Sequence, residues 1–273
     1  MKRIDTHQHL LYPEHFSYDQ TADIPSLARK AFRVAEYRAA ASGLEIAGAV
    51  LMEVDVPFEQ AAAEAAFFVG LANDAANGIS GVVAACRPEN GDITGWLHNT
   101  AHPRLCGYRR VLHTQPDDLS TTAVFRENVA RIGQAGLTFD LCVLPRQHAV
   151  AAELVDCCPE TRFILDHCGV PDIASGDLDA WRASLKELSR RPNLACKISG
   201  IIAYAAGVIT AETLRPVVEH AINCFSWNRV IWGSDWPVCN LTRDLATWTE
   251  CWMISWWTAP RKNSPRSNRI APV

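Results

Sequence analysis

The sequence predicts a single (β/α)8 barrel, and three observations lead to this prediction. Eight short runs rich in β-branched and other apolar residues alternate with stretches whose apolar residues follow helical spacing. The chain has 273 residues, close to the length of about 250 residues that is typical of such barrels. An open, doubly wound sheet is the competing fold. That fold would carry a glycine-rich phosphate loop after the first strand, where this chain has His7-Gln8-His9.

The strands are expected at eight places, roughly thirty residues apart, as eight units of such a barrel require. Each is a short run of mostly apolar residues, many of them β-branched, which favours an extended backbone. The runs cover Arg3–His7, Ile46–Val54, Ile79–Cys86, Leu105–Leu112, Leu137–Leu144, Arg162–His167, Leu194–Ser199 and Arg229–Asp235.

Between these strands the apolar period changes to that of a helix. The alanine-rich segment Glu59–Ala76 is the strongest helix former of the chain. Two further helices are predicted where apolar residues recur three and four positions apart. They are marked by Phe125, Val129 and Ile132 before Gly133 and Gly136, and by Trp181, Leu185 and Leu188 after a cap at Asp177.

The C-terminal end is atypical for a barrel. Trp248, Trp252 and Trp256 would line one helical face, which predicts a packed eighth helix. The segment after it is polar and contains proline and serine. We therefore expect residues 260–273 to be a disordered tail and residues 1–259 to form one barrel domain. The longest irregular stretch, Glu14–Arg29, is expected to lie over the barrel mouth.

Charge and cysteine content narrow the function classes. The net charge is −4, and four of the 26 basic residues follow position 260, which leaves 22 against 30 acidic residues in the barrel. Such a body offers no basic face for nucleic acid. No apolar run reaches the ~18 residues of a membrane span, and because the first strand is expected from about residue 3, we expect no signal peptide. Ten scattered cysteines without a C-x-x-C pair indicate a reducing cytoplasm.

The pair His7 and His9 closes the first strand. Side chains two apart on a strand share a face, so the two imidazoles can converge on one ion or one substrate atom. Such pairs are more often hydrogen-bonded at a strand end than bound to metal. Metal ligation therefore stays open on this motif alone.

Polar residues stand at the ends of further strands, and in this fold those ends meet at one mouth where active sites form. The residues are Glu53 and Asp55, Arg109 and Arg110, Asp166 and His167, Lys197 and Ser199, and Asp235 and Trp236. Lys197 and Ser199 share a face. They are expected to fill the lower layers of the barrel or to pair with Asp235, while Glu53 is a candidate partner for His9. Alternation lets only one of the two arginines point inward.

Several of these residues belong to longer motifs in a fixed order. The motifs are His7-Gln8-His9, Gly107 to His113, Leu165-Asp166-His167-Cys168-Gly169-Val170-Pro171, Cys196-Lys197-Ile198-Ser199-Gly200 and Trp232-Gly233-Ser234-Asp235-Trp236-Pro237. With them the chain resembles the amidohydrolase 2 branch of the amidohydrolase superfamily. More narrowly it is similar to the sugar-lactonase and pyrone-dicarboxylate-lactonase group, from residue 3 to about residue 245.

The resemblance implies a barrel that hydrolyses a cyclic ester. It implies that Asp235 is the general base on the attacking water, because a carboxylate is already ionised at neutral pH. His167 stands beside it as the second catalytic residue, and His7, His9, Arg109 and Trp236 would contact the substrate. The motif on strand 4 is the reason to choose Arg109 as the inward arginine, and Arg109 could stabilise the oxyanion.

The resemblance also implies a metal site. His7, His9, His167 and Asp235 offer enough ligands for one divalent ion, zinc in the first place. Two-metal members of the superfamily use a lysine on strand 4 and a histidine on strand 5, whereas this chain has arginines on strand 4 and no histidine in Phe139–Leu144. One metal is therefore expected rather than two. A metal-independent site stays open, because an activated ester does not demand a strong Lewis acid.

The expected substrate is a small-molecule sugar lactone. A pyrone dicarboxylate would need several arginines at the mouth, whereas this chain shows a single adjacent pair. Trp236 suits the C–H face of a neutral sugar. The resemblance suggests L-fucono-, L-galactono- or L-rhamnono-lactone. A pyrone-dicarboxylate lactonase, a metal-dependent decarboxylase of the same superfamily, and a barrel left inactive by its altered C-terminus are the alternatives, and a homo-oligomer stays open.

Overall fold

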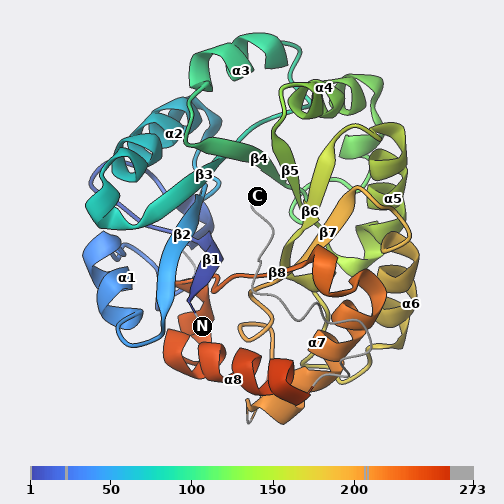
Figure 1. Ribbon diagram of the computed structural model, residues 1–273. Helices are drawn as coiled ribbons and strands as arrows, with labels where there is room; N and C mark the ends of the chain where they lie inside the picture. Colours follow the sequence, from blue (N-terminus) through green and yellow to red (C-terminus); the bar gives the residue numbers. More distant parts are fainter. Residues whose placement is uncertain (1, 22–23, 206, 208, 259–273) are drawn as a thin grey trace.

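The computed structural model describes residues 2–21, 24–205, 207 and 209–258. Within these ranges eight parallel strands lie in the order of the sequence, and eight α-helices surround them (Figure 1). The strands are β1 Arg3–Gln8, β2 Ile46–Met52, β3 Ile79–Ala85, β4 Leu105–Val111, β5 Thr138–Cys142, β6 Arg162–Leu165, β7 Leu194–Ile198 and β8 Val230–Trp232. The predicted (β/α)8 barrel is confirmed. The predicted tail, residues 260–273, lies outside the described residues.

Helices follow the strands around the outside of the ring. The α-helices are α1 Val34–Ala40, α2 Phe58–Asn73, α3 Ile93–Thr100, α4 Ala123–Gln134, α5 His148–Cys157, α6 Asp179–Leu188, α7 Ala211–Phe225 and α8 Leu245–Thr258. Short 3-10 helices are η1 Asp19–Thr21, η2 Ala75–Asn77, η3 Leu119–Thr121, η4 Pro145–Gln147, η5 Asp166–Gly169, η6 Trp227–Arg229 and η7 Val238–Leu241. None of the described helices is long and apolar enough to cross a membrane.

The first and last strands meet where the ring closes. The backbone N–H of Asp235 donates to the carbonyl of His7 at 2.7 Å, and the N–H of His9 donates to the carbonyl of Trp236 at 2.8 Å. The Thr6 hydroxyl donates to the carbonyl of Trp232 at 2.7 Å. These bonds bring the end of β1 and the segment after β8 side by side, which is where the sequence placed its histidine pair and its aspartate.

Alternation along the strands separates two environments. Tyr108 on β4 is opposite Phe139 on β5, and both are fully buried apolar rings. The next register pair is Arg109 and Asp140, whose side chains are buried and take part in ion pairs between strands. At this step of the register the charged side chains lie inside the barrel, while Phe139 packs against Phe125 of α4 in the layer between strands and helices.

The structure corrects two details of the predicted helices. Helix α6 is capped at Leu178 and not at Asp177, whose carboxylate instead accepts a hydrogen bond from the N–H of Asp179 at 3.2 Å. Gly133 does not end α4 but lies inside it. A Cβ atom at this position would lie 2.3 Å from the hydroxyl oxygen of Thr161, so the glycine allows the helix to approach the start of β6.

The predicted eighth helix is present as α8. Trp248 is fully buried, and its indole Nε1 donates to the carbonyl of Gly233 at 3.0 Å. Its ring also lies 6.5 Å from the ring of Trp232 on β8. The first part of α8 is thus packed against the strand that leads to Asp235, while the side chain of Trp256, predicted to lie on the same helical face, is outside the part that the structure describes.

Candidate metal and catalytic centre

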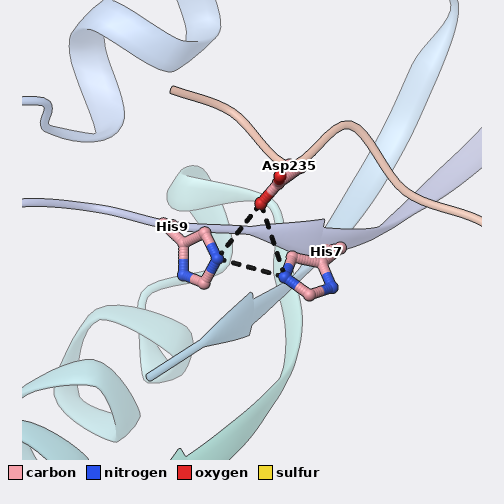
Figure 2. A group of neighbouring side chains, drawn as sticks. All are labelled: His7, His9 and Asp235. Carbon is pink, nitrogen blue, oxygen red and sulfur yellow. Dashed lines mark hydrogen bonds and ion pairs between the residues drawn. The ribbon is translucent and has the colours of Figure 1, made fainter. Parts of the chain in front are cut away.

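Three side chains converge at the junction of β1 and the segment after β8 (Figure 2). The Nε2 atoms of His7 and His9 are 3.1 Å apart. The Oδ1 atom of Asp235 lies 3.6 Å from His7 Nε2 and 3.3 Å from His9 Nε2. His7 lies in β1 and His9 directly after its end, and because residues two apart in extended chain share a face, the two imidazoles are presented together. Asp235 has a left-handed backbone with φ of 58°, which turns its carboxylate towards them.

The orientation of His7 comes from the residue behind it. His7 Nδ1 lies 3.4 Å from Asp166 Oδ1, and an ionised carboxylate can only accept a hydrogen bond. Arg109 Nη1, which can only donate, lies 3.3 Å from His7 Nε2, so Nε2 is the acceptor and the imidazole proton is on Nδ1, facing Asp166. The Nε2 lone pair therefore faces the triangle and the Arg109 guanidinium. Burial holds the pKa of His7 well below its usual value, against the opposing charge of Asp166. His7 is therefore a neutral imidazole, the form that binds metals.

His9 and Asp235 are also shaped by burial. The side chain of His9 is 7% exposed, and burial with the nearby Arg109 charge lowers its pKa to about 3. Burial raises the pKa of Asp235 to about 6, against the opposing effects of His167 and Arg109. At neutral pH most of the Asp235 side chains are still ionised. The triangle thus consists of two neutral imidazoles and one carboxylate that accepts a proton readily.

His167 flanks this triangle. Its Nδ1 atom lies 4.0 Å from Asp235 Oδ2 and 3.0 Å from the hydroxyl oxygen of Ser199. With His7 and Asp166 it forms a second group of close ligand atoms. The structure therefore brings all four predicted metal ligands together, with three of them in one triangle and His167 at its side.

A left-handed turn after β6 carries His167. His167, Cys168, Gly169 and Val170 all have positive φ, between 52° and 68°. Such a run is costly for residues with a Cβ atom, and it persists only where the surroundings enforce it. Two helices supply that support: Trp181 Nε1 of α6 donates to the carbonyl of Cys168 at 2.8 Å, and His148 Nε2 of α5 binds the carbonyl of Gly169 at 3.0 Å.

Arg109 points into the barrel, as predicted, and Arg110 does not reach the triangle. The Nε atom of Arg109 donates to Glu53 Oε1 at 2.5 Å, and its Nη1 lies 3.3 Å from His7 Nε2. Glu53 therefore pairs with Arg109, and its hydrogen bonds and ion pair do not reach His9, the partner that the sequence suggested; its charge still acts on His9 through space. Arg110 donates instead to Glu89 Oε1, at 2.9 and 2.6 Å.

Lys197 pairs with two carboxylates, neither of them Asp235. Its Nζ atom lies 2.5 Å from Asp140 Oδ2 and 3.0 Å from Asp166 Oδ1. The sequence reading gave no role to Asp140. The signal that could have found it is an acidic residue inside an otherwise apolar buried strand, since such a charge requires a buried partner.

The other sequence candidates lie around this centre. The ring of Trp236 is 2% exposed and packs edge-on against Phe32 and Tyr37, with ring centroids 5.5 and 5.4 Å apart. A contact of Trp236 with substrate stays a prediction. His113 contacts Cys142 Sγ at 3.1 Å and does not join the triangle.

The triangle fits a divalent cation on two grounds. Ligand atoms about 2.0–2.1 Å from a tetrahedral ion lie about 3.3 Å from one another, and the three distances here are 3.1, 3.3 and 3.6 Å. The second ground is charge. Four buried carboxylates around the triangle face two buried cations, which leaves an excess of two negative charges that a divalent ion would balance. They are the carboxylates of Glu53, Asp140, Asp166 and Asp235 and the cations Arg109 and Lys197.

Comparisons with known proteins agree with this geometry. The model of the amidohydrolase family matches residues 4–254. An L-fucono-1,5-lactonase of Burkholderia ambifaria is 33% identical over 140 residues, which cover 51% of this chain and 48% of that protein. An L-fucono-1,5-lactonase of Burkholderia multivorans is 30% identical over 176 residues, or 59% of this chain and 60% of that protein. The matched part thus spans about half the length of the first of these relatives.

The fold also has a close counterpart among solved structures. An amidohydrolase from Burkholderia multivorans, crystallised with bound zinc, superposes with a TM-score of 0.86 at 23% identity. The superposition covers 96% of this chain and 94% of that one. At this identity the likeness establishes the fold.

Proposed function

The chain belongs to the amidohydrolase family, and from this membership and the geometry of its site we propose that it hydrolyses the ring ester of a sugar lactone. The product would be the open-chain sugar acid. The observation that carries the proposal is the buried Asp235 carboxylate, which faces two neutral imidazoles where β1 and β8 meet. L-fucono-1,5-lactone, which the names of two relatives specify, is the first substrate to test.

Asp235 is the proton acceptor in the proposed reaction. It takes a proton from water as the water oxygen attacks the ester carbonyl carbon. Collapse of the tetrahedral intermediate then breaks the bond between that carbon and the ring oxygen. Asp235 returns the proton to the leaving oxygen, so the sum of the steps is the addition of one water molecule. Without a bound ion, burial raises the pKa of Asp235 to about 6, which suits both directions of proton transfer at neutral pH.

His7, His9 and Asp235 are the residues that would hold a divalent ion, with His167 as the fourth candidate ligand. Two imidazoles and a carboxylate are a typical donor set for zinc, and three protein ligands leave one position open for water or substrate. When bound, the ion would polarise the ester carbonyl and make water more acidic. The metal-independent alternative relies on Arg109, whose Nη1 lies beside His7 Nε2.

The arginines favour a neutral lactone over a pyrone dicarboxylate. Arg109 is paired with Glu53 and Arg110 with Glu89. A substrate with two carboxylates would have to displace these buried partners to obtain bidentate contacts. We therefore propose a small neutral sugar lactone, and not a dicarboxylate, as the substrate.

The test is acid release from a panel of aldonolactones, measured for the parent and for Asp235→Asn. We expect turnover of at least one lactone, and a fall in kcat of about 10²–10⁴-fold in the variant, the usual contribution of a positioned proton acceptor. The matched control is Asp179→Asn, since Asp179 has a side chain that is 90% exposed on α6. It should retain the activity of the parent.

Two results would contradict the proposal. One is an absence of turnover above the uncatalysed rate with every lactone, and the other is equal activity of Asp235→Asn and the parent. Metal analysis of the same samples separates the decarboxylase alternative, whose chemistry requires a tightly held ion. Activity that is unchanged after removal of all metal would exclude it.

A further inference from the structure

Lys197 on β7 is a lysine inside the barrel, with only 2% of its side chain exposed. Lysine is almost never buried to this extent unless it is paired. Here two carboxylates surround one ammonium group, Asp140 at 2.5 Å and Asp166 at 3.0 Å. The thioether of Met52 lies at 3.8 Å. One carboxylate would balance the charge, so the second contact calls for its own explanation.

The Oδ1 atom of Asp166 connects Lys197 to the triangle. It lies 3.0 Å from Lys197 Nζ and 3.4 Å from His7 Nδ1. The other oxygen of Asp166 lies 3.6 Å from Arg109 Nη1. Asp166 is fully buried, so no water layer can replace these contacts when one is removed. Its position against His7 therefore depends on the cations that hold it.

We propose that Lys197 is a positioning residue, which holds Asp166 against His7 Nδ1 and thereby keeps the Nε2 lone pair of His7 directed at His9 and Asp235. Lys197 acts through Asp166 and does not touch the triangle itself. The inference rests on the proposed function in one respect, namely that His7 is there to bind an ion. The orientation of His7 can be measured without that ion.

If Lys197 had a purely structural role, its replacement would have a different effect on His7. If the lysine only filled the interior and balanced Asp140, its loss would be harmless once Asp140 was neutralised as well. The double variant Lys197→Met with Asp140→Asn removes one positive and one negative charge and keeps the net charge. The single variant Asp140→Asn is the matched control, because the contact of Lys197 with Asp166 is retained.

The first measurement is the tautomer of His7 in the metal-free proteins, read from imidazole ¹⁵N chemical shifts. Loss of the His7 signals in His7→Asn assigns them. We expect the Nδ1–H tautomer in the parent and in Asp140→Asn, and a mixture of tautomers in the double variant. The second measurement is zinc affinity by competition with a chelator. The double variant should bind zinc about 10–100-fold more weakly than Asp140→Asn, as is usual when the partner of a ligating histidine is disturbed.

The proposal is overturned if the folded double variant matches Asp140→Asn in both the His7 signals and the zinc affinity. Should the double variant not fold, Lys197→Gln keeps a polar group of similar reach and is held to the same two expectations. If the parent itself binds no zinc, the metal part of the proposed function fails. The His7 signals then decide the role of Lys197 alone.

Discussion

His148 offers a measurable link between pH and the turn that carries His167. Its Nε2 atom lies 3.0 Å from the carbonyl of Gly169, and its Nδ1 lies 2.8 Å from the hydroxyl of Ser184. A carbonyl only accepts hydrogen bonds, so Nε2 carries the proton and Nδ1 is left unprotonated beside the Ser184 hydroxyl, which also lies 3.1 Å from the Trp181 carbonyl. Burial lowers the pKa of His148 to about 4. The folded protein thus holds a neutral imidazole here.

The sign of the effect follows from this lowered pKa. The unfolded chain takes up a proton at His148 near pH 6.5, whereas the folded protein does so only near pH 4. Stability from the neutral side chain is complete above pH 6.5 and is lost as the pH falls towards 4. At about 1.4 kcal/mol per pKa unit the full contribution is about 3 kcal/mol, of which about 2 kcal/mol is lost by about pH 5.

The perturbation is His148→Gln, which keeps an amide N–H for the Gly169 carbonyl but cannot take up a proton. Urea unfolding at about pH 7.5 and pH 5 gives the free energy of unfolding of both proteins. The advantage of the parent over the variant should shrink by about 2 kcal/mol between the two pH values. His98→Gln, at an exposed position of α3, is the control for the substitution itself. An equal stability difference at both pH values would refute the reasoning.

Three further predictions concern the residues that support the turn after β6, the end of β8 and the His7–His9–Asp235 triangle. Gly169→Ala adds a Cβ atom 2.3 Å from His148 Nε2 at a position with φ of 68°. We expect the free energy of unfolding in urea to fall by about 1–3 kcal/mol and kcat to fall as well. A stability equal to that of the parent would contradict this close contact. Trp248→Phe removes the hydrogen bond to the Gly233 carbonyl. It should lower the free energy of unfolding by about 1–2 kcal/mol, which is seen as a lower Tm. An unchanged Tm would show that this contact of α8 does not stabilise β8. Zinc at about 100-fold its Kd should raise the free energy of unfolding of the parent by about 2.7 kcal/mol. His7→Ala should show no such gain. An equal gain in both proteins would mean that the ion binds elsewhere.

The barrel could be predicted from sequence because its signal is local. Alternation and helical spacing are properties of neighbouring residues, and each of the eight expected strands overlaps an observed one. The ends of the strands do not follow from this local signal. The expected last strand ran to Asp235, but β8 ends at Trp232, and Asp235 lies beyond it with a left-handed backbone that no spacing rule indicates. Similarly, the turn after β6 contains His167, Cys168 and Val170 in conformations that their own preferences oppose.

For the candidate site, too, some features follow from the sequence and others only from the tertiary structure. The sequence by itself determined which residues stand at the mouth, since His7, His9, His167 and Asp235 end strands whose ends must meet. Only the tertiary structure decided which atoms face one another. It set Lys197 on Asp166 rather than on Asp235, and Glu53 on Arg109 rather than on His9. The physical reason is that a strand pattern fixes the face of a side chain, whereas an ion pair also depends on the register between strands distant in sequence and on the shared burial of both charges.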